Sequence, residues 1–435
     1  MTKEIGVGLI GVGTVGGGVA RALLERRAYF ASQVGAELVL RRAAVRDLTK
    51  PRTVDLPAGI LTTDVDAVIR APDIDVVVEL TGVDEPAGAF IRTALAAGKH
   101  VVTANKELIA KSGPELIALS RAARRDIMFE ATVGGGIPLI APLRRDLLAN
   151  RISSVRAIIN GTTNYILTKM AQEGTSYADA LAGAQALGYA EPDPTNDVEG
   201  IDAAYKLAIM ASLAFRVPVR PHHVHAEGIS KLAAADLRYA AELGYVIKLL
   251  AIAERIDGGI VTRVSPALLP QAEPLARVDG VFNAVQITGD LTGMVLLQGR
   301  GAGAEPTSSA VVADILDLAH SIVHAGSERE SWRYPAPEDA SSVAILGLDA
   351  LMTRFYLRVT VKDQPGVLAR IAQALGDAGV SIAAVNQKEA DETAGTAELV
   401  VMTHRAREGA MRAALATIEA LPVVARIESF LRVEA

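Results

Sequence analysis

The segment from residue 184 to residue 206 holds the densest group of side chains able to move protons. It reads AQALGYAEPDPTNDVEGIDAAYK, an acidic loop stiffened by Pro192 and Pro194 and followed by an apolar helical stretch. Asp202 and Lys206 are four residues apart and therefore share one face of that helix. Burial tunes the protonation of such a pair, which suits general acid–base chemistry.

Two interpretations of this pair stay open. It could be an i,i+4 ion pair on the helix surface, which contributes little to stability. Alternatively, Lys206 is desolvated, held by Asp202, and moves a substrate proton. Apolar residues on both sides of the helix favour burial. The carboxylates Glu191, Asp193 and Asp197 in the preceding loop are placed to meet a cationic group.

A glycine-rich turn follows the first apolar run. Gly11, Gly13 and Gly16 lie in GVGTVG, between a predicted buried strand and a predicted helix. In a dinucleotide-binding turn the first glycine permits the tight bend, the second lets the backbone approach the pyrophosphate, and the third allows close packing of helix on strand. The N–H groups at the helix start favour phosphate. We interpret the turn as a dinucleotide site rather than a structural glycine turn.

The end of the second predicted strand bears on the choice of dinucleotide. Asp47 stands where an NAD enzyme places its ribose-binding acid, but Arg46 precedes it and Lys50 follows. A guanidinium can pair with a 2′-phosphate. We favour NADP, with NAD as the alternative and a solvated Arg46 as the non-functional interpretation.

Two further polar segments are expected at the site. Lys106, in the sequence TANK, follows a predicted strand at the carboxyl edge of the sheet, where ligands of this fold class bind. The segment 160–164 (NGTTN) follows another predicted strand and is either a second site loop or a helix cap.

The surrounding pattern predicts an α/β protein with a Rossmann-type doubly wound parallel sheet at its N-terminus. Apolar runs alternate with helical spacing. The predicted strands are 5–10, 38–45, 76–79, 100–103 and 127–130, and the predicted helices are 15–27, 86–97 and 114–124. We expect residues 1–132 to form the dinucleotide-binding domain.

The remainder divides into three parts. Residues 133–325 are expected to form an α+β catalytic and dimerisation domain, including a strand at 155–159 and a helix at 307–325 that returns to the first domain. Residues 326–352 are predicted to be a linker. Residues 353–435 follow a ferredoxin-like βαββαβ order. Its strands are expected at 355–361, 381–385, 396–403 and 423–427, and its helices at 367–377 and 408–419.

Composition excludes several classes of function. The net charge is −6 and no cysteine is present, which argues against nucleic-acid or anionic-membrane partners and excludes disulfides and thiolate sites. Residues 5–20 are rich in glycine, unlike a signal peptide, and no apolar run reaches 18 residues. We expect a cytoplasmic protein.

Other chemical motifs carry little weight. His222, His223 and His225 lack a nearby carboxylate pattern, and His320 and His324 lack the glutamate of a zinc-binding HExxH motif. No serine-nucleophile elbow or Walker lysine is present, so hydrolase and kinase interpretations have no support.

The acidic segment resembles the motif of homoserine dehydrogenases, at its usual spacing. The matching positions are Ala184, Gly188, Tyr189, Ala190, Asp193, Pro194, Asp197, Val198, Gly200, Asp202 and Lys206. Segments 11–16, 103–106, 130–138 and 160–164 resemble family segments in the same order. Residues 353–435 resemble the ACT domain that many members carry.

This resemblance implies reversible oxidation of L-homoserine to L-aspartate 4-semialdehyde with NAD(P), in threonine, methionine and isoleucine biosynthesis. Lys206 would give and take the proton at the substrate oxygen. Asp202 and Glu191 would bind homoserine, with Asp197 and Tyr189 in the same substrate site.

The resemblance also implies the cofactor and cation contacts. Lys106 would lie beside both nicotinamide and substrate. Together with Gly11, Gly13, Gly16 and Arg46, the cofactor-binding residues would be Thr14, Val15, Thr81, Gly188 and Gly303. A monovalent cation, typically Na⁺, would lie near Glu130 and the backbone carbonyls of Val133, Gly135 and Ile137. Val83 departs from the pattern, because relatives often have a second glycine after Gly82.

The ACT-like tail implies regulation. Its first turn would contribute Asp363, Gly366 and Val367 to an effector site, and Asn386 and Gln387 would follow the second strand. The expected effector is L-threonine, and the alternative is a dimerisation module without ligand. A homodimer or homotetramer is expected.

Two other functions fit the sequence less well. Another Rossmann reductase acting on aspartate-derived metabolites would not predict the spacing of segment 184–206. A non-catalytic amino-acid sensor would have no need of a proton-transfer lysine at Lys206.

Overall fold

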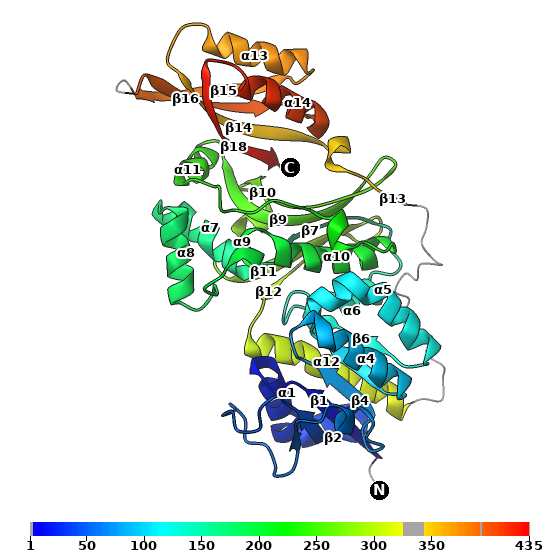
Figure 1. The fold of residues 1–435 in the computed structure, drawn as a ribbon. Coiled ribbons are helices and arrows are strands. Elements are labelled where there is room, and N and C mark those ends of the chain that lie inside the picture. The colour runs from blue at the N-terminus through cyan, green and yellow to red at the C-terminus, as the bar shows by residue number, and fades with distance from the viewer. Residues whose placement is uncertain (1–2, 325–342, 392–393, 435) are drawn as a thin grey trace. The chain divides into compact units, whose positions relative to one another are not determined.

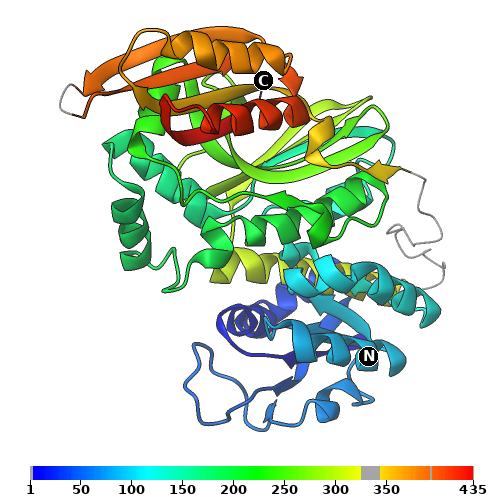
Figure 2. The same ribbon diagram turned by 45° about the horizontal axis from the view of Figure 1, so that its top comes forward.

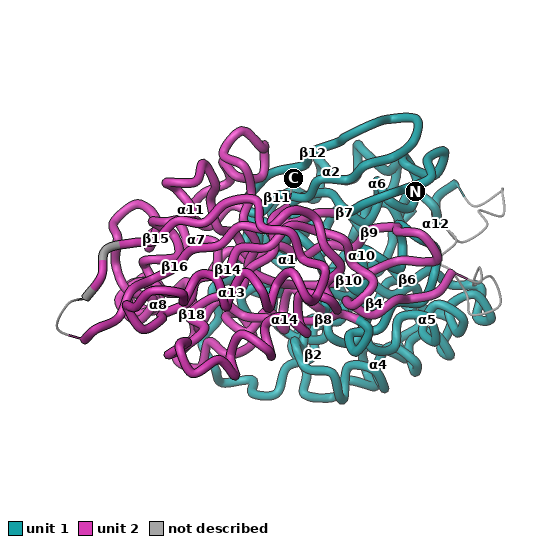
Figure 3. The backbone as a smooth tube through the Cα atoms, turned by 90° about the horizontal axis from the view of Figure 1, so that it is seen from above, with its two compact units in different colours: residues 1–155, 205–223, 283–342 teal, residues 156–204, 224–282, 343–435 magenta. Residues whose placement is uncertain are grey.

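The computed structural model describes residues 3–324, 343–391 and 394–434. Its chain divides into two compact units, coloured separately in Figure 3. The first unit comprises residues 1–155, 205–223 and 283–342, and the second comprises residues 156–204, 224–282 and 343–435. Residues 326–342 of the predicted linker, 326–352, lie outside the described residues. Within the described residues, no helix is both long and apolar enough to cross a membrane.

The first unit contains the six-stranded parallel sheet, and the predicted doubly wound fold is confirmed (Figure 1). Its strands in spatial order are β3 (Leu61–Thr62), β2 (Ala36–Ala44), β1 (Lys3–Ile10), β4 (Val76–Glu79), β5 (His100–Thr103) and β6 (Ile127–Met128). The central strands are buried runs rich in valine and isoleucine, as a sheet covered on both faces requires.

Helices cover this sheet. They are α1 (Thr14–Glu25), α2 (Arg27–Val34), α3 (Asp66–Ile69), α4 (Asp84–Ala96), α5 (Lys106–Ala122), α6 (Ile140–Arg144) and α12 (Ala304–Val323). Val311, Ile315 and Leu318 of α12 belong to the same buried core as Val7 and Leu9 of β1. The late helix therefore packs on the N-terminal sheet.

Several predicted boundaries in this unit are wrong: α1 ends at Glu25 rather than at residue 27, and α12 spans Ala304–Val323 rather than 307–325. Helix α5 begins at Lys106, not at residue 114, because the side chain of Asn105 caps it by accepting the N–H of Leu108 at 3.0 Å. Pro114 is tolerated inside the helix. Strand β6 ends at Met128, and the 3₁₀ turn η1 (Glu130–Thr132) follows.

The second unit is built on long antiparallel strands, β9 (Tyr245–Ile256) and β10 (Gly259–Pro270). Its shorter elements are α7 (Gly161–Glu173), α8 (Tyr177–Ala186), α9 (Thr195–Val198), β8 (His225–Ala226), α11 (Ala234–Glu242), η3 (Pro274–Arg277), β13 (Ala344–Ile345) and η5 (Leu348–Ala350). Elements that run across the division between the units are β7 (Ile152–Ile158), α10 (Ile201–Phe215) and β11 (Phe282–Gly289). In the first unit, β12 (Gly293–Arg300) follows β11, and η2 (Pro221–His223) follows α10.

The second unit also contains the C-terminal βαββαβ module, whose two helices lie on one face of its sheet (Figure 2). Its sheet order is β18 (Val424–Val433), β14 (Met352–Lys362), β16 (Thr396–Thr403), β15 (Ile382–Asp391), and its helices are α13 (Val367–Asp377) and α14 (Glu408–Glu419). The predicted ferredoxin-like arrangement is confirmed.

Three strands of the module are longer than predicted, among them β14, which spans Met352–Lys362 rather than residues 355–361. β15 continues to Asp391 rather than ending at residue 385, and β18 continues to Val433 rather than ending at residue 427. The extension of β18 pairs with β10, where Leu268 faces Val433, so the sheet that contains β9 and β10 continues into that of the module. The short strand β17 (Ala406–Arg407), which the pattern did not predict, pairs with β14.

Candidate functional site

The glycine turn after β1 has the geometry of a phosphate cradle. A Cβ on Gly11 would lie 2.7 Å from the Leu80 carbonyl oxygen, and one on Gly16 would lie 2.1 Å from the Gly11 carbonyl oxygen, so packing demands both glycines. A Cβ on Gly13 would meet nothing within 4 Å, which leaves its backbone open to a ligand. Gly13 is also the N-cap of α1 and provides no side-chain cap, so the N–H groups at the helix start can bind phosphate.

The loop after β2 presents two exposed cations, Arg46 and Lys50. Asp47 accepts the backbone N–H (2.8 Å) and the hydroxyl (2.7 Å) of Thr49, and these bonds lower the pKa of Asp47. Arg46 is exposed, and no carboxylate of the described residues pairs with it. Arg52, which sequence reasoning missed, donates to the carbonyl oxygens of Asp47 and Lys50 and so braces the loop.

Glu79 organises the carboxyl ends of β4 and β5. Its buried carboxylate accepts the N–H (2.7 Å) and hydroxyl (2.6 Å) of Thr81 and the hydroxyl of Thr103 (2.7 Å). Thr81 was predicted as a cofactor contact. Glu79 was assigned only to a strand, because no local pattern reveals that Thr103 of the neighbouring strand converges on it together with Thr81.

Lys106 is placed by its neighbour. Asn105 caps α5, and its amide donates to the Val83 carbonyl at 2.6 Å. Lys106 is therefore fixed as the first residue of α5, directly after the carboxyl end of β5. This is the edge at which open parallel sheets bind ligands.

In the second unit, Asn160 gathers the predicted carboxylates. Its amide nitrogen donates to Asp197 at 2.7 Å and to Asp202 at 3.0 Å. Its side-chain oxygen accepts the Thr163 N–H at 2.9 Å and caps α7. Asn160 is therefore the helix cap of α7, and it also joins two of the carboxylates that the sequence assigned to the substrate site.

The loop before Asp197 is open to ligands. Gly188 has a φ of +74° and nothing within 4 Å of a built Cβ. Tyr189 is 44% exposed, and its ring packs at a tilt against that of Tyr165 with centroids 5.1 Å apart. Its carbonyl accepts the Thr162 hydroxyl. Glu191 is exposed, and within the described part of the chain no cation pairs with it.

Asp193 serves the loop itself. It accepts the backbone N–H (3.1 Å) and hydroxyl (2.6 Å) of Thr195, and these bonds lower the pKa of Asp193. Among the carboxylates of this loop, Asp193 therefore holds the turn, whereas Glu191 presents its charge outward.

Asp202 and Lys206 lie one turn apart on α10 and are 4% and 8% exposed. This burial is inconsistent with a solvent-exposed surface pair. It is the environment in which a lysine can exchange protons with a substrate.

The segment predicted to hold a cation is a tight turn. Both carboxylate oxygens of Glu130 are occupied by the backbone N–H groups of Leu139, Ile140 and Ala141, at 2.6 to 2.8 Å. A Cβ on Gly135 would lie 2.0 Å from the Gly301 carbonyl, so the turn packs closely on the segment that leads to Gly303, the N-cap of α12. The donors left in the turn are backbone carbonyls, which suit a hard cation.

The predicted effector residues occupy two places in the module. Asp363 and Gly366 are exposed in the turn after β14, and Gly366 has a φ of +87°. Val367 is 5% exposed and packs in the module's core, so only its backbone faces that turn. Asn386 and Gln387 are exposed and lie within β15, not after it, because that strand is longer than predicted.

The discounted histidines are accounted for locally. His225 pairs with Glu227 at 2.7 Å, and the ring of His222 packs on that of His223. Among the residues that the structure describes, no three His, Cys, Asp or Glu side chains gather in a way that could hold a metal ion.

Comparison with known proteins places this geometry in a family. Residues 138–316 match the family profile "Homoserine dehydrogenase", residues 11–130 match "Homoserine dehydrogenase, NAD binding domain", and residues 355–423 match "ACT domain". Proteins named homoserine dehydrogenase from Neisseria gonorrhoeae and Pseudomonas aeruginosa are 43% and 44% identical, and each alignment covers 99% of both chains.

Solved structures agree. A homoserine dehydrogenase from Thiobacillus denitrificans is 45% identical with a TM-score of 0.94, covering 100% of this chain and 99% of that one. A hyperthermophilic archaeal homoserine dehydrogenase in complex with NADPH is 29% identical with a TM-score of 0.63, covering 76% of this chain and 100% of that one. The glycine cradle, the carboxylates gathered by Asn160 and the C-terminal module therefore belong to a member of the homoserine dehydrogenase family that carries an ACT domain.

Proposed function

We propose that this chain interconverts L-homoserine and L-aspartate 4-semialdehyde with the proton moved by Lys206. The observation that carries the proposal is the burial of Lys206 and Asp202 on one face of α10, with Asp202 and Asp197 joined through Asn160. Lys106, at the start of α5, is assigned a place beside nicotinamide and substrate.

The chemistry follows from the charges of homoserine. Its ammonium requires a carboxylate. Glu191 is assigned that role together with Asp202, because Glu191 has no cation partner in the described structure. Asp197 and Tyr189 complete the substrate site. The bound nicotinamide supplies or accepts the hydride. Lys206 takes the hydroxyl proton during oxidation and returns it to the carbonyl oxygen during reduction. Its burial keeps water from competing for that proton.

We assign NADP as the preferred cofactor, with NAD as the alternative. Arg46 is exposed at the end of β2 without a carboxylate partner, and Asp47, the acid that would bind a free ribose, is engaged by Thr49. Gly11, Gly13, Gly16, Thr14 and Val15 would hold the pyrophosphate, and Thr81, Gly188 and Gly303 would complete the cofactor site. The NADPH complex of the archaeal relative supports a nicotinamide dinucleotide, not the preference itself.

A sodium ion is proposed in the turn after η1. Its ligands would be the backbone carbonyls of Glu130, Val133, Gly135 and Ile137. The Glu130 carboxylate fits a different role, because three backbone N–H groups already occupy it and hold the turn in shape.

The ACT module is proposed to bind L-threonine and thereby to reduce the activity of the enzyme by feedback. The enzyme would be a cytoplasmic homodimer or homotetramer and would act in the biosynthesis of threonine, methionine and isoleucine. Asp363, Gly366, Asn386 and Gln387 are exposed and would supply the polar contacts. A dimerisation module without ligand is the alternative. The functional domains would be 1–132, 133–325 and 353–435.

The test is NADPH or NADH oxidation with L-aspartate 4-semialdehyde, with and without L-threonine. We expect turnover that threonine inhibits. Turnover with another aspartate-derived substrate alone would indicate a different reductase, and dinucleotide binding without any turnover would indicate a sensor. For the effector, Gln387→Ala should raise the threonine concentration needed for inhibition, with the exposed Gln373→Ala on α13 as control. Equal threonine sensitivity in both variants would contradict the assigned site.

A further inference from the structure

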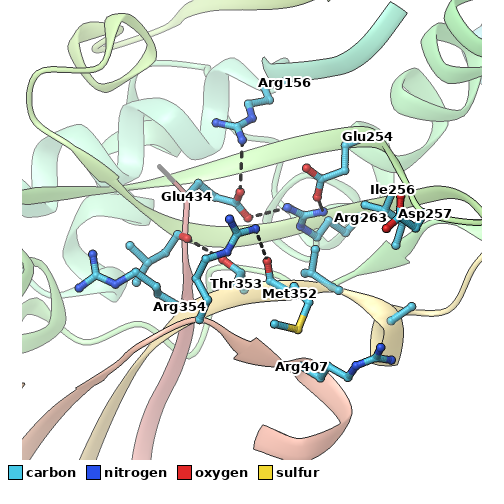
Figure 4. Close-up of a pocket in the computed structure, with 14 residues that line it drawn as sticks. Arg156, Glu254, Ile256, Asp257, Arg263, Met352, Thr353, Arg354, Arg407 and Glu434 are labelled. Atoms are coloured by element: carbon cyan, nitrogen blue, oxygen red, sulfur yellow. Dashed lines mark hydrogen bonds and ion pairs between the residues drawn. The ribbon is translucent and has the colours of Figure 1, made fainter. Parts of the chain in front are cut away.

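A cavity of about 380 Å³ lies inside the second unit, where the long strands β9 and β10 meet the C-terminal module (Figure 4). Its catalytic-part residues come from β7, β9 and β10, and its module residues come from β14, β17 and the end of β18. Neither the glycine cradle nor the acidic segment contributes a residue to it. The cavity is large enough for a small metabolite.

One side of the cavity, here called the floor, is balanced in charge. Arg263 is 1% exposed and bonds Glu254 at 2.5 Å and Glu434 at 2.6 Å. Arg156 lies 3.9 Å from the second oxygen of Glu434. Two guanidinium groups thus meet two carboxylates, and the cationic neighbours keep the pKa of Glu434 below its ordinary value although burial alone would raise it.

The rest of the cavity is not balanced. Arg354, Arg405 and Arg407 line it, and the single acidic residue besides those of the floor is the exposed Asp257. Across all the lining residues, five arginines face three carboxylates, which leaves a net charge of +2.

Arg354, Arg405 and Arg407, here called the wall arginines, use few of their hydrogen-bond donors. Arg354 donates to the Thr403 carbonyl and to the Tyr245 hydroxyl, both at 3.3 Å, and Arg405 donates to the Met352 carbonyl at 3.0 Å. Arg407 has no hydrogen bond from its guanidinium to the described residues, and no carboxylate there pairs with any of the three. Each guanidinium has five N–H donors arranged to bind oxyanions in pairs.

We propose that this cavity binds a small dianion, either a phosphate monoester or a dicarboxylate. The two surplus positive charges match two negative charges, and guanidinium groups recognise carboxylate and phosphate oxygens through paired hydrogen bonds. A zwitterionic amino acid such as threonine lacks that net charge. The site is therefore separate in chemistry from the effector turn at Asp363 and Gly366.

The position of the cavity gives such binding a structural consequence. Arg156 and Arg263 belong to the catalytic part of the unit, whereas Arg354, Arg405 and Arg407 belong to the module. A dianion held by both groups stabilises the attachment of the module to the sheet that β10 and β18 share. The inference goes beyond the proposed reaction and does not depend on it.

The test is the thermal unfolding midpoint of the full chain in inorganic phosphate and in succinate, each against sodium chloride of equal ionic strength. The variant is Arg407→Met, because that guanidinium makes no hydrogen bond whose loss would disturb the described fold. The control is Arg370→Met, an exposed arginine of α13 that does not line the cavity. Arg407→Lys keeps the charge but not the paired geometry.

We expect phosphate or succinate to raise the midpoint of the wild type and of Arg370→Met by several degrees, and to raise that of Arg407→Met by less than half as much. Arg407→Lys should fall between them. The anion with the larger effect identifies the ligand as phosphate-like or dicarboxylate-like. The proposal is overturned if neither anion exceeds the chloride control, or if Arg407→Met and Arg370→Met respond equally.

Discussion

The amide nitrogen of Asn160 lies 3.0 Å from the carboxylate of Asp202, and the same nitrogen lies 2.7 Å from Asp197. One neutral donor therefore joins two acidic side chains that would otherwise repel each other. Because Asn160 also caps α7, the position of these carboxylates is tied to the helix that begins after β7. This relationship makes Asn160 a positioning residue for the substrate site.

Asn160→Ala should therefore lower kcat/KM. Each hydrogen bond to a carboxylate that persists in the transition state contributes about 1.5–3 kcal/mol. Losing these bonds therefore corresponds to a tenfold or larger decrease in kcat/KM. Steady-state assays should show the loss with NADPH binding unchanged. If Asn160→Ala reduced only thermal stability and kept the wild-type kcat/KM, its role would be that of a helix cap alone.

Arg46→Ala should raise the KM for NADPH about tenfold or more and change the KM for NADH little. The reason is that a guanidinium bonded to a 2′-phosphate makes charge-assisted hydrogen bonds, which NADH cannot accept. The control is Arg70→Ala, an exposed arginine of the first unit paired with Asp66. Equal changes in both KM values would remove the 2′-phosphate role from Arg46.

The module is held to the catalytic part by a buried ion pair, which predicts a stability effect. Asp236 is fully buried and accepts Nε and Nη2 of Arg358, at 2.8 and 3.2 Å. Asp236→Ala leaves that guanidinium with Glu398 alone and should destabilise the unit by about 3 kcal/mol or more. Glu398→Ala, at a side chain that is 28% exposed, should cost about 1 kcal/mol. Urea denaturation of both variants checks this order, and the reverse order would contradict it.

A second junction predicts a pH dependence. Glu227 is partly buried, which would raise its pKa, but His225 and Arg432 bring it well below the ordinary value of 4.5. A carboxylate with a depressed folded-state pKa adds stability above about pH 4.5 and loses it as the pH falls toward its folded value. The advantage of the wild type over Glu227→Gln in unfolding midpoint should therefore be full near pH 6 and shrink below about pH 4.5. Glu419→Gln, at an exposed site, should show no such trend. An advantage that grew on acidification would contradict the assigned direction.

Much of the fold is readable from local pattern. The strands 76–79 and 100–103 coincide with β4 and β5, because buried parallel strands are short, continuous runs of β-branched residues. The start of α5 was missed because Pro114 resembles a helix N-terminus, whereas the actual cap is Asn105, nine residues before the predicted start. The start of α5 is set by the side chain that caps it. Several polar residues nearby could serve as that cap, and the sequence alone does not distinguish among them.

The site was only partly predictable. Segment 184–206 revealed its own carboxylates and lysine, since their spacing is local. Glu79 was missed because one of its partners, Thr103, is brought to it by the neighbouring strand β5. The arginine cavity was missed because it depends on the pairing of β10 with β18, residues that are more than 160 positions apart. No periodicity in sequence encodes such a contact.

The most direct test of the central claim is the rate of NADPH oxidation with saturating L-aspartate 4-semialdehyde for Lys206→Ala. The account predicts a kcat reduced by at least about a thousandfold, in the range lost when a general acid–base group is removed, with NADPH affinity within twofold of wild type. The matched control, Lys231→Ala at an exposed lysine, should keep its kcat. A near-wild-type kcat in Lys206→Ala would contradict the assignment of Lys206 as the proton-transfer residue.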